Sequence, residues 1–285
     1  MLSKLFLHLA FLSLVACEMK HDIFLISGLS GSGKNPRIDA LTAKGFTHIS
    51  SGNMFRSLIS ETSDLFNTFS PGQLGFEDSG FNRELATSTL SSHEVANIED
   101  LLIALETKYY LENGLYVPDR LTNQIVAKHL RHQNSPSVLD GFPRTKAQAS
   151  WLTEWLAESN FHLRAVILVE TDEQVILHRL AGRRVCPACN KVYHVEHNPP
   201  PLEGGRCECG EKVVIRKDDQ PELIKRRFSE FYNKTVPMIS YLVDMSIPLV
   251  SVNGDIKPYT REAVNRELID ELHNSGIFLE NTVNV

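Results

Sequence analysis

A glycine-rich stretch near the N-terminus has the residue types and spacing of a phosphate-binding loop. It runs Gly28-Leu-Ser-Gly31-Ser-Gly33-Lys34, and it follows a short apolar run, 23–26, that is typical of a buried strand in a parallel sheet. Glycines let successive backbone N–H groups point inward, and a lysine adds a positive charge beside them. Because strand, loop, lysine and a helical pattern occur in this order, the sequence predicts a phosphate site at a helix N-terminus. A flexible loop that merely contains glycines is the weaker alternative.

The two residues after the lysine depart from the usual pattern of such loops. A Ser or Thr hydroxyl normally follows the lysine and binds magnesium, whereas this chain has Asn35 and Pro36. Proline is tolerated in the first turn of a helix but has no N–H to offer a phosphate. One lost charge-assisted hydrogen bond is worth about 1.5–3 kcal/mol, so we expect phosphoryl transfer to be slowed rather than abolished.

A second stretch, Val138-Leu-Asp140-Gly141-Phe-Pro-Arg144, joins the end of a strand to a tight turn. In phosphate-loop enzymes an acid in this position manages magnesium or its water shell, which predicts that role for Asp140. Arg144 suits a second phosphate group, which a guanidinium can bind through two N–H groups. The alternative is a surface turn with a capping acid.

Strand-like and helix-like segments alternate along the chain, which predicts an α/β fold. The expected class is a parallel sheet with helices on both faces, the P-loop nucleoside triphosphate fold, with two inserted subdomains. The segment 60–97 is rich in Ser, Thr, Asn and Gly and indicates an insertion or a long mobile loop. The expected strands and helices are 23–26, 48–50, 138–140, 163–169 and 249–252, and 38–45, 98–111, 120–131, 173–180, 222–235 and 261–274.

Composition is that of an ordinary globular protein, with 285 residues, 42% hydrophobic and 22% charged. A net charge of −6 argues against a nucleic-acid surface, so a nucleotide site would depend on local clusters of arginine. The sequence carries no evident oligomerisation signal, and a monomer is expected.

The first eighteen residues have some features of a secretory signal. Lys4 precedes the apolar run 5–16, and Cys17 stands where a lipid could be attached. However, the first expected strand begins only a few residues later, and Met19 is a credible start. We therefore expect a cytoplasmic protein with a dispensable leader, the alternative being an exported protein anchored by lipid through Cys17.

Four of the five cysteines fall in one short segment. Cys186 and Cys189 have the two-residue gap of a zinc site, whereas Cys207 and Cys209 have only one residue between them. We expect this group of cysteines to bind a zinc ion. The zinc would be structural, because four protein ligands leave no open position for chemistry. A redox disulfide, free thiols, or a ligand role for His194 or His197 are the alternatives.

Five segments, taken in order, resemble adenylate kinase, and the resemblance runs from about residue 19 to the C-terminus. The cysteine segment is similar to the long lid of the bacterial-type enzymes. Asn35 and Pro36 replace the Gly-Thr that usually follows the lysine in this family, and Asn53 replaces a common Asp. The five segments are residues 28–34, Ser-Ser-Gly-Asn-Met-Phe-Arg at 50–56, Asp-Gly-Phe-Pro-Arg at 140–144 with Gln148, Gly-Arg-Arg at 182–184 and Arg-Lys-Asp-Asp at 216–219.

The resemblance implies reversible, magnesium-dependent transfer of a phosphoryl group from ATP to AMP. The domains it implies are a core of 19–49, 138–182 and 220–285, an AMP-binding subdomain of 50–137 that holds the 60–97 insertion, and a lid of 183–219. A kinase for another nucleoside monophosphate, or a weakly active nucleotide-binding pseudo-kinase, remain alternatives.

The resemblance also assigns residues. Asp218 and Asp219 would orient the arginines around the transferring group. The ATP-binding set is Gly28, Gly31, Ser32, Gly33, Lys34, Asn35, Arg179 and Arg183. The AMP-binding set is Ser51, Arg56, Gly141, Arg144, Gln148, Arg216 and Arg227. The catalytic set is Lys34, Asp140, Arg144, Arg183, Arg216 and Arg227, and the zinc set is Cys186, Cys189, Cys207 and Cys209.

Overall fold

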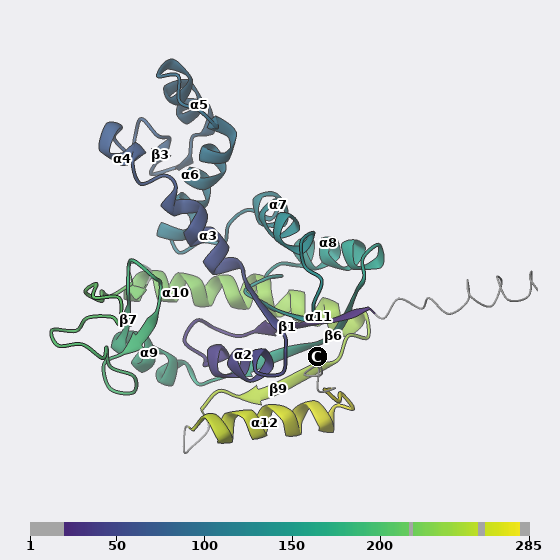
Figure 1. The fold of residues 1–285 in the computed structure, drawn as a ribbon. Helices are drawn as coiled ribbons and strands as arrows, with labels where there is room; N and C mark the ends of the chain where they lie inside the picture. Colours follow the sequence, from purple (N-terminus) through teal and green to yellow (C-terminus); the bar gives the residue numbers. More distant parts are fainter. Residues whose placement is uncertain (1–19, 217–218, 256–259, 280–285) are drawn as a thin grey trace, which may run out of the picture.

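The centre of the protein is a five-stranded sheet, shown in Figure 1 for a computed structural model that describes residues 20–216, 219–255 and 260–279. Its strands lie in the order β2-β5-β1-β6-β9, and every neighbouring pair is parallel. The α/β class with a parallel sheet is therefore confirmed. The strands are β1 (His21–Ser27), β2 (Thr47–Ser50), β5 (Ser137–Asp140), β6 (Phe161–Glu170) and β9 (Leu249–Asn253).

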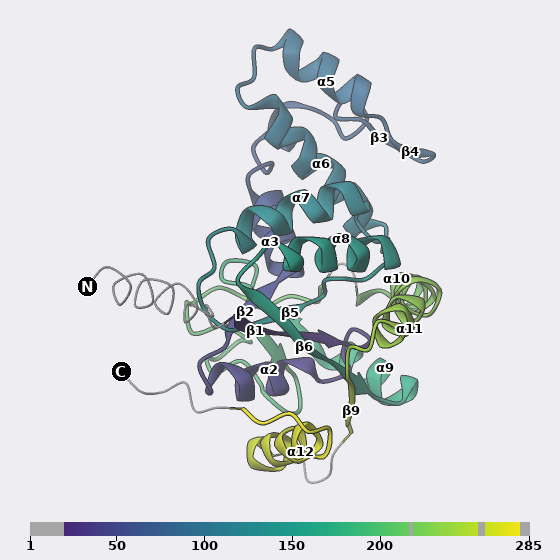
Figure 2. The same cartoon turned by 90° about the vertical axis from the view of Figure 1, so that its right-hand side faces the viewer.

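Helices cover both faces of this sheet, as Figure 2 shows. Alternate residues of β1 point to opposite faces, so Ile23 and Leu25 pack in one core and Phe24 and Ile26 in the other. The first core is completed by α7 (Asp119–Leu130), α8 (Lys146–Ala157) and α11 (Val236–Asp244), and the second by α2 (Lys34–Thr42) and α12 (Arg261–Asn274). Both cores hold the carboxyl ends of the strands in fixed positions.

A second unit projects away from the sheet and contains the segment 60–97 (Figure 1). It has its own apolar cluster, in which Ala86 and Leu90 pack against Leu102 and Leu105. These residues have helical spacing, which the many polar residues around them conceal, and the interpretation of 60–97 as a long loop is therefore wrong. The unit is built from α3 (Ser51–Ser60), α4 (Leu65–Thr68), β3 (Phe76–Glu77), β4 (Gly80–Phe81), α5 (Arg83–Ser92) and α6 (Ile98–Glu112).

The remaining elements are the cysteine segment with the helix that leads into it, and the long helix that follows. Helix α9 (Glu173–Gly182) leads into a small antiparallel pair, β7 (Arg183–Val185) and β8 (Val192–His194), at the cysteine segment. Helix α10 (Pro221–Glu230) continues through a π-helical turn, Phe231–Thr235, into α11, so the helix expected to end at residue 235 runs on to Asp244.

Several expectations fall outside the described part of the chain. They are the leader 1–18 with its possible lipid site Cys17, and Asp218. Within the described residues, no helix combines the length and the apolar character needed to cross a membrane.

Candidate active site

A cavity of about 1510 Å³ opens at the carboxyl ends of the parallel strands, where α/β proteins usually bind ligands. It brings together most of the predicted ATP- and AMP-binding residues from segments far apart in the sequence. Ser32, Ser51 and Gln148 are buried behind its wall rather than on it. The predicted residues that line it are Gly28, Gly31, Gly33, Lys34, Asn35, Arg56, Asp140, Gly141, Arg144, Arg179, Arg183, Arg216 and Arg227.

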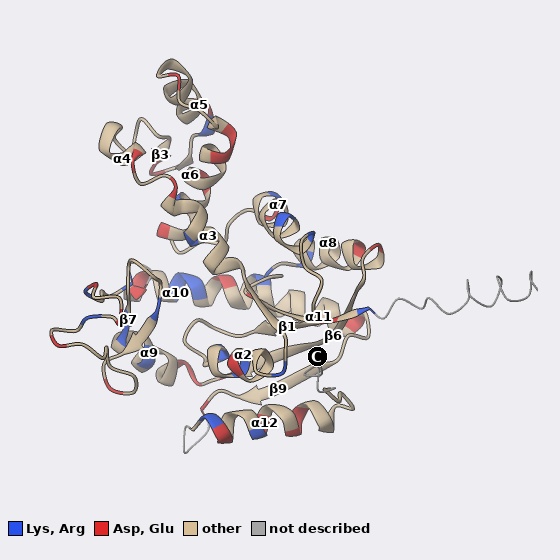
Figure 3. Ribbon diagram, viewed as in Figure 1, with Lys and Arg blue, Asp and Glu red and all other residues tan. Residues whose placement is uncertain are grey.

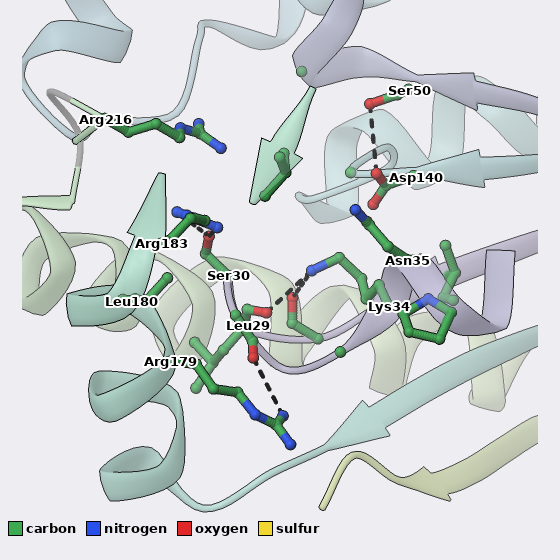
Figure 4. Close-up of a pocket in the computed structure, with 18 of the residues that line it drawn as sticks. Leu29, Ser30, Lys34, Asn35, Ser50, Asp140, Arg179, Leu180, Arg183 and Arg216 are labelled. Carbon is green, nitrogen blue, oxygen red and sulfur yellow. Dashed lines mark hydrogen bonds between the residues drawn. The ribbon is translucent and has the colours of Figure 1, made fainter. Parts of the chain in front are cut away.

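The glycine-rich loop lies between β1 and α2, with Gly33 as the N-cap of the helix. Gly33 has a φ of 96°, and a Cβ on Gly28 would lie 2.6 Å from the carbonyl oxygen of Val169, so both positions require glycine. The Nζ of Lys34 donates to the carbonyl oxygens of Gly28 and Leu29 at 2.9 and 3.0 Å, as Figure 4 shows. The lysine therefore lies along the loop that it is expected to serve.

The environment of Lys34 is unfavourable for a positive charge. Burial lowers the pKa of its ammonium group to about 8, and the positive charges of Arg144, Arg227 and Arg183 act in the same direction. The carboxylate of Asp140 opposes this effect. An anion that entered the cavity would relieve the repulsion, so the site is suited to highly charged anions.

Asp140 stands at the end of β5 and faces the cavity. Burial by itself would raise the pKa of its carboxyl group, but a hydrogen bond from His48 and the positive charge of Lys34 outweigh this, and the pKa lies below its ordinary value. Its Oδ2 is 3.5 Å from Nε2 of His48 and 3.4 Å from Oγ of Ser50. An ionised, oriented carboxylate of this kind suits a magnesium ion or its bound water.

Arg183 is held by a buried acid and points to the glycine-rich loop. Its Nε donates to Oδ2 of Asp219 at 2.7 Å, and a second N–H of the guanidinium donates to Oδ1. The other face of the guanidinium lies 3.4 Å from the hydroxyl of Ser30 in the loop, and Arg227 lies 4.0 Å from Asp219. Asp219 thus holds Arg183 by two charge-assisted hydrogen bonds and lies within ion-pair distance of Arg227 (Figure 4 shows Arg183 and Ser30).

Arg179 and Arg144 are also fixed by neighbours. Arg179 donates to the carbonyl oxygen of Gly254 at 3.0 Å and lies 3.4 Å from those of Gly31 and Ser32. Arg144 donates to the carbonyl of Gly141 at 2.7 Å, and its guanidinium lies over the ring of Tyr116. Both arginines are therefore presented in defined orientations.

The buried polar residues behind the wall support these positions. The side-chain oxygen of Gln148 accepts the N–H of Arg144 at 2.7 Å, and its nitrogen donates to Asp119 at 2.8 Å. Ser51 donates to the carbonyl of Gly141 at 2.8 Å. Pro118 is the N-cap of α7, and the carboxylate of Asp119 accepts hydrogen bonds from Thr145 and Gln148.

Sequence reasoning did not identify His48 or Tyr116 as residues of the site. Both line the cavity, and each contacts a residue that was identified, Asp140 and Arg144 respectively. The pairing of β2 with β5 places Ser50 beside Asp140 and His48 beside Val138. Strand β2, Thr47–Ser50, holds only one apolar residue, Ile49, so a histidine there gave no local signal for a role in the site.

The four cysteines of the lid segment lie together, although their spacing is irregular. Their sulfur atoms are all within 4.8 Å of one another, with Cys186–Cys209 and Cys189–Cys207 distances of 3.5 Å. Zn–S bonds of about 2.3 Å in a tetrahedron would hold sulfur atoms about 3.8 Å apart, so the cluster is compatible with zinc. The rings of His194 and His197 stack on each other and form a separate group with Glu196.

Tyr193 supports the thiol cluster. Its hydroxyl donates to Sγ of Cys207 at 3.1 Å. This hydrogen bond is the main reason that the pKa of Cys207 falls to about 6. Within the cluster the effects differ, since backbone hydrogen bonds, which lower the pKa of Cys189 and of Cys209, are outweighed by hydrogen bonds from neighbouring thiols, which raise it.

Residues 83–247 match the family model described as "Adenylate kinase". An adenylate kinase of Clostridium beijerinckii is 33% identical over 234 residues, which cover 81% of this chain and 90% of that protein. The chain belongs to the adenylate kinase family. Adenylate kinases of Clostridium botulinum agree with this, with 32% identity over 234 residues in the Langeland strain (81% of this chain, 90% of the relative) and 40% over 163 residues in the Hall strain (56% and 74%).

Membership of the adenylate kinase family makes the chain a nucleoside monophosphate kinase, a phosphotransferase. The resemblance inferred from the five segments is thereby confirmed. The matched residues 83–247 include the Asp140–Arg144 turn, the arginines of α9 and α10 and the four clustered cysteines, and they begin after the glycine-rich loop.

Proposed function

We propose that this protein catalyses the reversible transfer of the terminal phosphoryl group of ATP to AMP, giving two ADP. The observation that carries the proposal is one large cavity lined both by the phosphate loop with Lys34 and by the arginines Arg144 and Arg56 from other segments. Two anionic nucleotides need cationic groups from several segments, because they must approach each other against their own repulsion. The family membership supports the same reaction.

The proposed ATP site consists of the loop and two arginines of α9 and β7. The backbone N–H groups of Gly28, Gly31, Gly33 and Asn35 would surround the phosphates, while Ser32, whose N–H donates to Leu29 at 3.1 Å, would hold the shape of the loop. Lys34 would exchange its bonds to the loop carbonyls for bonds to phosphate oxygens. Arg179 would lie beside the base, and Arg183 beside the transferring group.

The proposed AMP site consists of other lining residues of the same cavity. Arg144 and Arg56 would bind the acceptor phosphate, with Gly141 in the wall and Ser51 and Gln148 fixing the turn behind it. Arg56 donates to the side-chain oxygen Oδ1 of Asn53 at 2.5 Å, which supports a role for the Asn at position 53 in orienting this arginine. Arg216 and Arg227 would complete the charge around the transferring phosphoryl group.

Asp140, whose ionised carboxylate faces the cavity, would bind magnesium or its water shell. When bound, the ion supplies neutralisation of the phosphate charge during transfer. His48 and Ser50 hold the carboxylate that would orient it.

The experiment that tests the acceptor is a screen of nucleoside monophosphates. Purified protein is given magnesium and ATP with AMP, CMP, UMP or GMP, and nucleoside diphosphate formation is followed. We expect kcat/KM to be greatest for AMP. A preference for another acceptor would assign the protein to a different nucleoside monophosphate kinase activity.

The pH dependence of ATP binding follows from the lowered pKa of Lys34. Free protein loses this proton near pH 8, whereas bound phosphates would hold the ammonium form, so binding above about pH 8 must take up a proton. We expect ATP affinity to fall by up to about tenfold per pH unit above pH 8. Calorimetry in buffers of different ionisation enthalpy measures the uptake, and Lys34→Arg, which stays protonated, should abolish it. An affinity that does not change between about pH 7 and pH 9.5 would contradict the assignment.

The lowered pKa of Lys34 changes the stability of the free protein with pH in the opposite direction to ATP affinity. The native protein releases the Lys34 proton near pH 8, but the unfolded chain keeps it up to its ordinary pKa of 10.5. The contribution of Lys34 to the free energy of unfolding therefore rises between these values, while ATP affinity falls. Thermal unfolding of free protein over the same pH range separates the two effects.

We further propose a structural zinc ion on Cys186, Cys189, Cys207 and Cys209, holding the shape of the lid 183–219. We expect about one zinc per chain, and a melting temperature that falls by several degrees when a chelator removes it. Cys189→Ser should lose the metal, whereas His197→Ala should keep it, because His197 belongs to a separate group. An unchanged melting temperature after removal of the metal, or loss of zinc in His197→Ala, would contradict the four-cysteine site.

We also propose the domain limits that the resemblance implies. We further propose a monomeric state, the lack of a nucleic-acid partner and a cytoplasmic location. The net charge of −6, with acidic and basic residues interspersed along the same helices in Figure 3, supports the lack of a nucleic-acid partner. The need for ATP supports the cytoplasmic location. Cell fractionation with determination of the mature N-terminus distinguishes this location from export and lipid attachment at Cys17.

A further inference from the structure

One arginine behind the phosphate loop has no part in the site described so far. Arg37 lies three residues after Lys34 on α2, its side chain is 0% exposed, and it does not line the cavity. Its guanidinium donates to the carbonyl oxygen of Gly33 at 3.0 Å, to that of Asn253 at 2.6 Å and to Oε2 of Glu267 at 3.2 Å. It thus joins the loop to β9 and to α12.

The contact with Gly33 fixes more than a carbonyl group. The carbonyl of Gly33 and the N–H of Lys34 belong to one planar, trans peptide unit and point in opposite directions. Gly33 is the N-cap of α2, so its carbonyl is directed into the helix and the N–H of Lys34 is one of the first N–H groups of the helix, which are open to an anion. The guanidinium of Arg37 adds a side-chain hydrogen bond that holds the same carbonyl in place.

The preceding peptide unit is held in a similar way. Thr171 donates to the carbonyl of Ser32 at 2.8 Å, which orients the N–H of Gly33. The N–H of Ser32 is different, because it donates to Leu29 within the loop at 3.1 Å. The N–H groups of Gly33 and Lys34 are therefore two donors whose direction is set from behind.

Pro36 makes these two donors more important. It is the third residue of α2, where the helix itself needs no N–H, but where a phosphate-binding loop would offer one. With that donor absent, more of the phosphate binding depends on the N–H groups that precede it.

Packing alone does not account for Arg37. Placing a guanidinium at this depth has a desolvation cost that an aliphatic residue of similar volume would not have. Glu267 compensates for the charge, and it also accepts the N–H of Asn253. Both groups of the ion pair thus bind backbone atoms: Arg37 binds those of Gly33, which lines the cavity, and of Asn253, and Glu267 binds the N–H of Asn253.

We propose that Arg37 is a positioning residue for the ATP phosphates, acting through the Gly33–Lys34 peptide unit with Glu267 as its anchor. This inference rests on the proposed function. It assigns to the buried pair between α2 and α12 a role in donor affinity, and no role in acceptor binding.

The test uses a double variant, because Arg37→Met alone would leave the partly buried carboxylate of Glu267 without its ion-pair partner and would destabilise the protein. Arg37→Met/Glu267→Met removes both charges. We expect it to keep its melting temperature within a few degrees, to raise the Kd and KM for ATP about tenfold, and to leave the KM for AMP unchanged. Arg37→Lys, which can still donate to Gly33, should recover part of the lost affinity.

The matched control is Arg164→Met/Asp22→Asn, which removes an ion pair of 3.4 Å at the opposite end of the sheet and should change neither KM. Calorimetric titration of each protein with magnesium and ATP, without AMP, measures the Kd directly. A folded double variant with wild-type ATP affinity would overturn the inference, as would equal losses for ATP and AMP. Wild-type protein that binds no ATP would instead overturn the proposed function on which the inference depends.

Discussion

Replacing Lys34 with methionine is expected to lower kcat/KM for ATP by about 10²- to 10³-fold. Methionine keeps the length of the side chain but loses the charge that the proposed mechanism aims at the transferring phosphates. Steady-state kinetics with magnesium, ATP and AMP measure the effect.

Folding should not suffer from this change. Burial lowers the pKa of Lys34 to about 8, which means that its charge is disfavoured in the free protein, so Lys34→Met should melt at the wild-type temperature or above it. Lys128→Met, which alters an exposed lysine of α7, serves as the control and should have wild-type kinetics. Lys34→Met with more than about a tenth of wild-type activity would show that the loop lysine is not part of the reaction.

Replacing Arg183 is expected to have the second large effect. Arg183 binds both oxygens of Asp219 and reaches the hydroxyl of Ser30 in the phosphate loop, so it can bridge the lid and the ATP phosphates. We expect Arg183→Met to lower kcat by about 10²- to 10³-fold. Arg183→Lys should recover little, because an ammonium group cannot make two parallel bonds to the carboxylate.

The buried acid makes a second variant necessary. The side chain of Asp219 is 0% exposed, and an unpaired buried carboxylate destabilises a protein by about 3–5 kcal/mol. Arg227 lies 4.0 Å from it and compensates in part. Arg183→Met/Asp219→Asn should therefore melt at a higher temperature than Arg183→Met and remain as inactive, as single-turnover rates would show. Recovery of activity together with stability would mean that Arg183 only neutralises Asp219.

The chemistry-bearing turns were predictable from sequence because each is a local structure. The glycines and Lys34 need only the residues next to them to form a phosphate loop, and Asp140 and Arg144 lie on one tight turn. The sheet was predictable for a related reason, since short apolar runs alternate with helical patterns.

Contacts between distant segments could not be predicted in this way. His48 reaches Asp140 only because β2 pairs with β5, and Arg37 reaches Glu267 across 230 positions of sequence. The irregular gap between Cys207 and Cys209 suggested a misplaced ligand, yet the turn around Gly210 brings both sulfur atoms into the cluster. No local pattern carries this information.

Two helical features were missed for different reasons. Helix α8 directly follows the Arg144 turn. The helical spacing of Ala149, Leu152 and Leu156 indicates this helix, but it was not used in the prediction. In the 60–97 segment, polar residues outnumber a small apolar core, so composition favoured a loop. The helical spacing of the few apolar residues was the better guide.

The most direct test of the account is AMP-dependent ADP formation. Wild-type protein beginning at Met19 is incubated with magnesium and ATP, with and without AMP, beside Lys34→Met prepared in the same way. The account predicts two ADP for each ATP consumed, only when AMP is present, with the reverse reaction forming ATP and AMP from ADP, and loss of both in the variant. A folded wild-type protein that binds ATP but forms no ADP would contradict the account, and it would make the protein a nucleotide-binding member of the family without transferase activity.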